Sequence, residues 1–309
     1  MKELELAIVG GGIAGMSCAV YAKRAGLNPV IFEKAALGGQ LMYINRIDNY
    51  PAVKPGSTGA EFLNVLSSSV KELNIEVKEE AVTRVAAEES KVVISSDDKE
   101  YSAGSLVVAS GASFRKLGVE GEDKFAGRGV SWCAVCDGYF FRDKKVAIVG
   151  GGNTAVEDAI YLSSVCSKVY LIHRRDKLRA LDYLQKELFD RSNIEIIWNS
   201  VIKKISGDNF VKEIEIENVV DDKKSVLETS ALFIAVGIKP NTDICAGIID
   251  IDNGGFVITD EYMKTSCDYI YACGDCRKRP LRQLITAASE GAIAALSAYR
   301  YLKNSYVSY

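Results

Sequence analysis

The six residues AIVGGG occur twice in this chain of 309 residues, at 7–12 and again at 147–152. In both places a short apolar run enters the glycines, and a stretch that begins with small residues leads to a second apolar run. A strand, a glycine turn, a helix and a second strand form the opening βαβ unit of a dinucleotide-binding domain. The repeat therefore predicts two such domains in one chain.

The similarity extends beyond the two glycine turns. Hairpin patterns with Asp-rich turns follow at 91–102 and 213–228, and apolar runs into glycine follow at 105–113 and 231–240. A Gly-Asp element at 274–275 returns to the first pattern, so we expect the second copy to be inserted in the first. The expected fold class is α/β, with two Rossmann-like three-layer nucleotide-binding domains. We expect one domain at 1–115 and 243–309, the other at 116–242, and linkers at 111–121 and 237–247.

The charge balance argues against two classes of partner. The chain has 38 Lys and Arg against 41 Asp and Glu, a net charge of −3. This balance gives no electrostatic reason to expect nucleic acid or an anionic membrane as a partner. No apolar run approaches the roughly 20 residues of a membrane span, and the N-terminus lacks the pattern of a signal peptide. We therefore expect a cytoplasmic protein.

The first glycine turn has the spacing of a pyrophosphate-binding loop. Gly10 permits the tight turn, Gly12 lets a pyrophosphate approach the backbone, and Gly15 lets helix and strand pack closely. The amides at the helix N-terminus are then available to phosphate. Glu33 closes the second strand, where a carboxylate can hold ribose hydroxyls.

The second turn reads Gly150-x-Gly152-x-x-Ala155, and the position equivalent to Glu33 is His173. A basic cluster, HRRDKLR, begins there. Because a carboxylate would repel a 2′-phosphate and guanidinium groups bind one, this half is expected to prefer NADP. The alternative is a solvated basic helix start. Two dinucleotide sites in one chain suggest hydride transfer between cofactors, and a flavin can pass two electrons on.

Two close cysteine pairs require an explanation. Cys133 and Cys136 lie two residues apart in VSWCAVCDGYFF (130–141), followed by Asp137, which could move the proton that thiol exchange requires. A redox-active disulfide is the preferred interpretation. A structural pair, or a zinc site shared with Cys273 and Cys276, are the alternatives. The remaining cysteines, at 18, 166, 245 and 267, are expected to be small buried residues.

With these motifs the chain resembles the low-molecular-weight thioredoxin reductases, members of the pyridine nucleotide-disulfide oxidoreductases, over essentially its whole length. The matching segments are GGGIAG (10–15), GGQL (38–41), Asn49-Tyr50-Pro51, CAVCDG (133–138), GGGNTA (150–155), HRRDKLR (173–179), GD (274–275) and RQL (282–284).

The resemblance implies an NADPH-dependent thioredoxin-disulfide reductase that is a homodimer, with FAD in the outer domain and NADPH in the inserted one. It implies that Cys136 faces the flavin, Cys133 attacks thioredoxin and Asp137 is the acid–base, and that the inserted domain rotates. The FAD contacts implied are Gly10, Gly12, Ala14, Gly15, Glu33, Lys34, Gly39, Gln40, Leu41, Asn49, Gly111, Gly274, Asp275, Arg282, Gln283 and Leu284. The NADPH contacts implied are Gly152, Asn153, Thr154, His173, Arg174, Arg175 and Arg179.

Other functions stay open at this point. A related flavoprotein could serve a peroxiredoxin or a glutaredoxin-like protein, or could take electrons from ferredoxin, although the ferredoxin-linked type is expected to lack GGGNTA and HRR. An alkyl hydroperoxide reductase flavoprotein would need an extra N-terminal redox domain, and a zinc-stabilised nucleotide sensor would not be an enzyme. Within the resemblance, Cys273 stands where a small apolar residue is usual. We expect the second pair to be no dithiol relay, and the tyrosines of the closing SYVSY to be surface or dimer contacts.

Overall fold

A computed structural model describes residues 2–44, 47–97 and 99–304, and the closing SYVSY lies outside these residues. The chain forms two compact units. Residues up to Ser113 and from Lys239 onward form unit 1, and Phe114–Ile238 form unit 2. The expected fold class, with one α/β unit inserted in the other, is confirmed.

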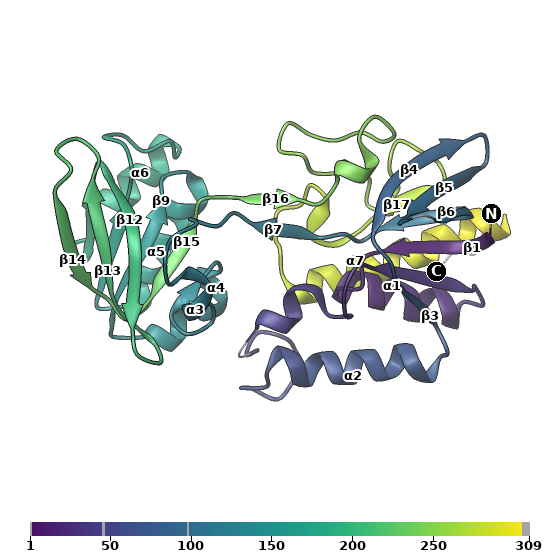
Figure 1. Ribbon diagram of the computed structural model, residues 1–309, viewed down its shortest axis with the longest axis horizontal. Helices are drawn as coiled ribbons and strands as arrows, with labels where there is room; N and C mark the ends of the chain where they lie inside the picture. The colour runs from purple at the N-terminus through teal and green to yellow at the C-terminus, as the bar shows by residue number, and fades with distance from the viewer. Residues whose placement is uncertain (1, 45–46, 98, 305–309) are drawn as a thin grey trace. The chain divides into compact units, whose positions relative to one another are not determined.

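Unit 1 is built on a mixed sheet of seven strands (Figure 1). The parallel part follows the sequence prediction, because β1 pairs with both β2 and β6 while β2 pairs with β3. The other edge of β6 pairs first with β5, over residues 99–103, and then with β17, over residues 106–108. The strands are β1 (Lys2–Val9), β2 (Pro29–Glu33), β3 (Glu76–Glu79), β4 (Val82–Glu88), β5 (Lys91–Ser96), β6 (Lys99–Val108) and β17 (Ile270–Ala272).

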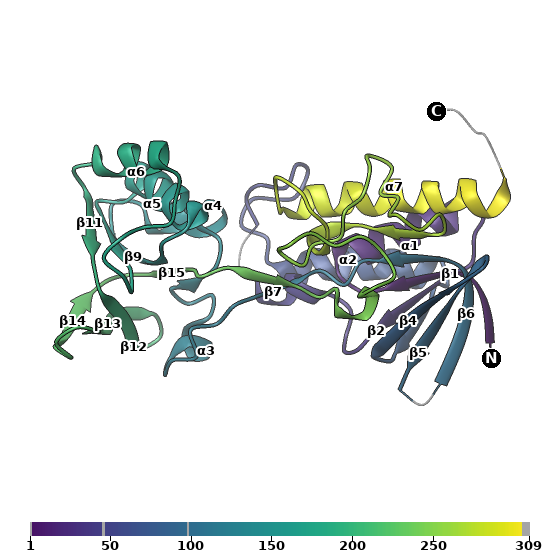
Figure 2. The same cartoon turned by 90° about the horizontal axis from the view of Figure 1, so that it is seen from above.

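Helices α1 (Ile13–Arg24) and α7 (Leu284–Lys303) pack together on one face of this sheet (Figure 2). Small residues allow the contact: a Cβ on Gly291 would lie 2.2 Å from the carbonyl oxygen of Ala14. The central β1 residues Leu6 and Ile8 are fully buried. Burial of each such side chain stabilises the folded state by about 1.5–3 kcal/mol. The other helical segments are α2 (Gly59–Glu72), η1 (Gly39–Tyr43), η3 (Asp243–Cys245) and η4 (Gly274–Cys276).

Unit 2 has a parallel sheet like the parallel part of unit 1, but its hairpin strands do not join that sheet. Its parallel sheet has the order β11-β10-β9-β15-β8, and its hairpin strands form a separate antiparallel sheet, β12-β13-β14. The parallel strands are β8 (Val130–Ser131), β9 (Lys145–Gly150), β10 (Lys168–Ile172), β11 (Ile194–Ile197) and β15 (Leu232–Ala235). The antiparallel strands are β12 (Ser200–Gly207), β13 (Val211–Asn218) and β14 (Lys224–Glu228).

The helical segments of unit 2 place the cysteine pair beside the parallel sheet. Helix α4, which carries the pair, packs against α5, and a Cβ on Gly138 would lie 2.9 Å from the Leu162 side chain. Fully buried Ile148 and Phe233 lie in the core beneath. The segments are α3 (Glu122–Phe125), α4 (Ala134–Asp137), η2 (Gly138–Phe141), α5 (Asn153–Val165) and α6 (Asp182–Phe189).

The chain passes between the units through two short strands that pair with each other, β7 (Ala112–Phe114) and β16 (Ile238–Pro240). On the unit 1 side the Ser110 hydroxyl donates to the carbonyl oxygen of Asn241 (2.6 Å), and the Asn241 side chain donates to the carbonyl oxygen of Ser110 (3.0 Å). The rotation implied by the resemblance stays a prediction. None of the helices in the described part of the chain is long and apolar enough to span a bilayer.

Candidate functional site

The first glycine loop has the geometry that its spacing predicts. Gly10 has φ +109°, and a Cβ there would lie 2.3 Å from the carbonyl oxygen of Ala109. A Cβ on Gly15 would lie 1.9 Å from the carbonyl oxygen of Gly10, so neither position admits a side chain. Gly12 differs, because no atom lies within 4 Å of its Cβ position. The open space above Gly12 fits a pyrophosphate at the start of α1.

Glu33, at the end of β2, is hydrogen-bonded to the loop itself. Its Oε2 accepts from the Gly11 amide at 2.7 Å, and its Oε1 accepts from the Ala35 amide at 3.2 Å. Each carboxylate oxygen has a second lone pair. A contact with ribose hydroxyls is therefore compatible with these bonds and stays a prediction.

The GGQL segment passes over the same loop. The Gly38 amide donates to the carbonyl oxygen of Gly11 at 2.9 Å, and a Cβ on Gly39 would lie 3.3 Å from the Gly12 Cα. Gln40 donates to the carbonyl oxygen of Ala112. Of the other expected contacts near this segment, Leu41 is buried in the core, whereas Lys34 is exposed.

The Gly-Asp element follows β17 and faces the start of α1. Gly274 has φ +77°, and a Cβ on it would lie 2.9 Å from that of Ala14. Burial raises the pKa of Asp275, and the nearby Arg279 and Arg282 offset part of the rise. Asp275 Oδ1 has no hydrogen-bond partner among the described residues, and its ion-pair contact is Arg279 Nη1 at 3.5 Å. An unsatisfied buried oxygen fits a hydroxylated ligand such as a ribityl chain.

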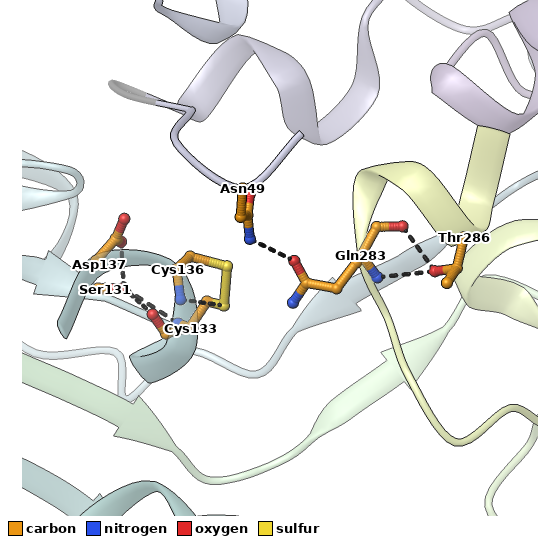
Figure 3. Close-up of a disulfide and its surroundings, with 7 residues drawn as sticks. All are labelled: Asn49, Ser131, Cys133, Cys136, Asp137, Gln283 and Thr286. Atoms are coloured by element: carbon orange, nitrogen blue, oxygen red, sulfur yellow. Dashed lines mark hydrogen bonds between the residues drawn. A yellow bond between two sulfur atoms is a disulfide. The ribbon is translucent and has the colours of Figure 1, made fainter. Parts of the chain in front are cut away.

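The RQL segment, at the start of α7, is hydrogen-bonded to the loop that carries Asn49 (Figure 3). Asn49 donates to Gln283 Oε1 at 3.0 Å, and Thr286 Oγ1 caps the helix by accepting from the Gln283 amide at 3.2 Å. The Arg282 guanidinium lies 4.3 Å from the centre of the Phe256 ring, and its buried Nε lacks a partner within the described chain. Leu284 begins α7, and Gly111 adopts φ +66° with open space at its Cβ position.

The second loop has the same shape as the first. A Cβ on Gly150 would lie 2.5 Å from that of Ala155, whereas no atom lies within 4 Å of the Cβ position of Gly152. Exposed Asn153 and Thr154 begin α5. The Asn153 side chain accepts from the Leu181 amide at 3.0 Å, which ties the helix start to the segment after the basic cluster.

The basic cluster divides into a buried part and an exposed part. His173 is 4% exposed, with Nδ1 2.7 Å from the carbonyl oxygen of Gly150 and Nε2 2.9 Å from that of Lys177. Arg174, Arg175 and Arg179 are exposed, and the described residues hold no ion-pair partner for them. Since the Arg179 amide donates to the carbonyl oxygen of Gly151 at 2.7 Å, Arg179 lies beside the loop where a 2′-phosphate is expected. Arg174 and Arg175 directly follow His173, whose ring contacts the same loop at Gly150.

Cys133 and Cys136 form a disulfide at the start of α4, with a Cα–Cα distance of 5.3 Å (Figure 3). Cys133 is the N-cap of the helix, and its Sγ accepts from the Cys136 amide at 3.2 Å. A cysteine thiolate released on reduction would retain this donor. The half-buried Asp137 carboxylate accepts from the Ser131 hydroxyl at 2.6 Å. Burial raises the pKa of Asp137, and the bond from Ser131 offsets part of this rise.

The other cysteines are free thiols. Cys18, Cys166 and Cys245 are buried as predicted, but Cys267 is only half-buried, so that prediction was wrong for Cys267. It lies in a turn before β17, where its amide donates to Thr265 Oγ1, rather than inside a strand or helix. The described residues contain no group of three or more His, Cys, Asp or Glu side chains that could hold a metal.

Two polar residues of the site escaped the sequence interpretation. Ser131 bonds both Asp137 and the Cys133 amide. Glu290 is buried in α7 and accepts from the Gly274 amide at 2.8 Å and from Arg277 at 2.6 Å. The available signals were a serine two residues before the first cysteine of the pair, and a lone acid in the small-residue run LITAASEGAIAALSA.

Comparisons with known proteins agree with this arrangement. The family model described as pyridine nucleotide-disulphide oxidoreductase matches residues 4–291. The chain is 36% identical over 308 residues to a thioredoxin reductase of Peptoclostridium acidaminophilum, covering 98% of each chain. It is 38% identical to a thioredoxin reductase of Helicobacter pylori, covering 97% of this chain and 99% of that one. The crystal structure of thioredoxin reductase from Streptococcus pyogenes superimposes with a TM-score of 0.95 at 39% identity, covering 98% and 99% of the two chains.

Proposed function

The chain belongs to the pyridine nucleotide-disulphide oxidoreductase family, and we propose that it reduces the disulfide of thioredoxin with NADPH. The observation that carries this proposal is the Cys133–Cys136 disulfide with Asp137 beside it, in a unit that also contains a dinucleotide loop. The relatives named thioredoxin reductase support the choice of partner.

In this proposal FAD binds to unit 1. Gly12 leaves room for its pyrophosphate, Glu33 faces the adenosine ribose, and Asp275 accepts from the ribityl chain. When bound, the flavin accepts two electrons from a reduced nicotinamide and passes them to a disulfide. Asn49, Gln283 and Arg282 complete the lining of this site.

NADPH binds to the loop of unit 2, with Arg174, Arg175 and Arg179 at its 2′-phosphate. The backbone at Gly152 is open to the pyrophosphate. His173 fixes the conformation of the loop through the contacts of its ring nitrogens with the carbonyl oxygens of Gly150 and Lys177. The exposed guanidinium groups favour NADPH over NADH, because only NADPH carries the phosphate that they recognise.

The dithiol then serves the partner protein. Cys133, the N-cap of α4, attacks the partner disulfide, Cys136 closes the ring again, and Asp137 supplies and receives the protons. Val135 and Tyr139, which are 55% and 59% exposed beside the pair, offer apolar surface to a protein substrate.

An anaerobic titration tests the steps of the proposed reaction one after another. The purified protein should contain flavin, lose the flavin absorbance on addition of NADPH, and regain it on addition of oxidised thioredoxin. Reduced ferredoxin and NADH serve as competing donors, and a glutaredoxin-like protein and a peroxiredoxin as competing acceptors. A protein that ferredoxin reduces and NADPH does not would overturn the choice of donor, and turnover with a competing acceptor alone would overturn the choice of partner.

We also propose a cytoplasmic homodimer. Free buried thiols such as Cys18 and Cys245 are usual in a reducing compartment. The exposed Ile285 and Ile293 of α7 line a groove of about 480 Å³ that a second copy could cover. Sedimentation equilibrium at micromolar concentration should give twice the chain mass, and a monomer there would contradict the dimer.

A further inference from the structure

The Ser131 hydroxyl contacts three groups of the dithiol site. Ser131 ends β8 and is 6% exposed. Its Oγ donates to Asp137 Oδ2 at 2.6 Å and accepts from the Cys133 amide at 3.1 Å, as Figure 3 shows. The carbonyl oxygen of Cys133 lies 3.4 Å from the same Oγ. A hydroxyl has one hydrogen to donate and two lone pairs to accept with, so two acceptors compete for that hydrogen.

The protonation of Asp137 decides which acceptor takes the hydrogen. An ionised carboxylate takes it, because hydrogen bonds to a charged group are the stronger ones. A protonated Asp137 can instead donate to Ser131 Oγ, whose own hydrogen then turns to the Cys133 carbonyl. The Cys133 amide stays bonded to Oγ in both cases, so every buried polar group of this cluster keeps a partner in either state.

No other hydrogen-bond donor to the Asp137 carboxylate occurs within the described chain. Helix α4 packs against α5 and η2. Their titratable side chains are Glu157, Asp158, Tyr161 and Tyr139. Burial and the nearby Glu157 raise the pKa of Asp158 to about 7. These elements therefore bring no cation to Asp137.

We propose that Ser131 is a positioning residue of the dithiol reaction, whose hydroxyl links the Asp137 carboxyl to the backbone of Cys133 and switches acceptor as Asp137 gives and takes its proton. This inference rests on the proposed function, since it deepens the role of Asp137 in thiol-disulfide exchange.

The protons and electrons of the exchange balance around this carboxyl. The Cys133 thiolate attacks one partner sulfur and forms a mixed disulfide, and the leaving thiolate takes the proton of Asp137. Asp137 next takes the proton of the Cys136 thiol, whose sulfur attacks Cys133 and expels the second partner thiolate. That thiolate takes the proton back from Asp137. Two electrons and two protons have then moved to the partner, and the Cys133–Cys136 bond has formed.

The choice of leaving group gives a specific test, because an acidic thiol leaves without a proton and an alkyl thiol does not. The pair is reduced chemically, the reductant is removed, and the reoxidation rate is followed against pH with two small probes. One probe is bis(2-hydroxyethyl) disulfide, an alkyl disulfide, and the other is 5,5′-dithiobis(2-nitrobenzoate), an aromatic one. Neither NADPH nor thioredoxin takes part, so failure of the proposed partner or donor would leave this result intact.

In Ser131→Ala the alkyl probe should react on the order of tenfold more slowly, a fraction of what a general acid contributes, while the aromatic probe keeps its rate. The ratio of the alkyl rate to the aromatic rate cancels the ionisation of Cys133, and this ratio falls as pH rises and Asp137 ionises. Without the Ser131 bond the carboxylate is less stable, so this fall should move to higher pH by about one pH unit.

Three variants complete the experiment. Ser131→Thr keeps a hydroxyl and should restore both the rate and the pH profile. Ser163→Ala removes another buried hydroxyl of unit 2, one bonded to a backbone carbonyl, and should change neither. Asp137→Asn should slow the alkyl probe at least as much as Ser131→Ala. An unchanged alkyl rate and profile in Ser131→Ala, or an equal loss with both probes, would overturn the inference.

Discussion

Two cysteine pairs with the same spacing have opposite surroundings in this molecule. Cys133 and Cys136, in unit 2, form a half-buried disulfide at the start of α4. Cys273 and Cys276, in unit 1, are free thiols with no exposed surface. The C-x-x-C spacing alone therefore does not distinguish a redox pair from two core residues.

What distinguishes them is access. The first pair lies at the start of α4 beside the exposed Val135 and Tyr139. In the second pair, Cys276 Sγ lies within donor distance of two carbonyl oxygens, 3.4 Å from that of Val108 and 3.3 Å from that of Cys273, and burial raises its pKa to about 11. Burial also raises the pKa of Cys273 well above the ordinary range. Without a thiolate or an approach for a second disulfide, exchange at this pair is blocked.

The largest expected effect is on turnover by the first pair. Cys133→Ser or Cys136→Ser should abolish thioredoxin reduction, because one sulfur cannot both attack the partner and close the ring. Reduction of the flavin by NADPH should persist, since it precedes the dithiol. Stopped-flow spectra and thioredoxin assays measure the two steps separately, and residual turnover in either variant would show a route that bypasses the pair.

Thiol labelling should separate the two pairs by orders of magnitude. After mild reduction, iodoacetamide at pH 8 should modify Cys133 rapidly, because an ordinary thiol is about a quarter ionised there. A thiol with a pKa of about 11, as in Cys276, is ionised to about one part in a thousand at that pH. Mass spectrometry of the folded protein measures both sites. Labelling of Cys276 should rise with pH up to about 11, and rapid labelling at pH 8 would contradict its burial.

The repeat predicted the two α/β frames because periodicity and glycine spacing are local properties of a sequence. The sequence did not predict which sheet each hairpin would join. In unit 1 the long strand β6 pairs with β1 and β5, so the hairpin extends the main sheet. In unit 2 the corresponding strands form a sheet of their own. Whether a hairpin joins a sheet depends on strand length and on packing between distant segments.

The residues of the candidate site also fall into two groups, those that local spacing predicted and those that depend on tertiary contacts. Spacing identified the glycines at 10, 12 and 15 and the Cys133–Cys136 pair, because their chemistry depends on neighbours in the sequence. Ser131 and Glu290 act through tertiary hydrogen bonds, and Glu290 reaches Gly274 across 16 residues. Cys267 was assigned to the core by residue type, but it lies in a turn. The contacts of the expected nucleotide-binding residues with FAD and NADPH stay predictions.

Asp275 lies between Cys273 and Cys276 in the sequence. Unlike these two buried thiols, it is expected to take part in binding FAD. Asp275→Ala should weaken FAD binding by roughly tenfold to a hundredfold, the effect of losing one hydrogen bond to a charged group. Fluorescence titration of the apoprotein with FAD measures this. Asp268→Ala removes an exposed carboxylate of unit 1 paired with Lys264 and should leave FAD binding unchanged. Equal affinity in Asp275→Ala and the wild type would remove Asp275 from the flavin site.

The smallest expected effect belongs to the second cysteine pair itself. In the double variant Cys273→Ala and Cys276→Ser, FAD content and thioredoxin turnover should stay within about a few-fold of the wild type. The serine hydroxyl can replace the Cys276 thiol as the donor to one of the two carbonyl oxygens, that of Val108 or that of Cys273. Some loss of thermal stability is expected, on the order of 1 kcal/mol or more for each altered core side chain.

Cys18→Ala, which removes another fully buried thiol of the same core, is the matched control for that loss. Melting temperature, flavin absorbance and turnover are measured together, so a folding defect and a catalytic defect give different patterns. Turnover that stops while FAD stays bound would mean that buried thiols exchange electrons after all. Burial would then be insufficient to explain why only one of the two pairs forms a disulfide.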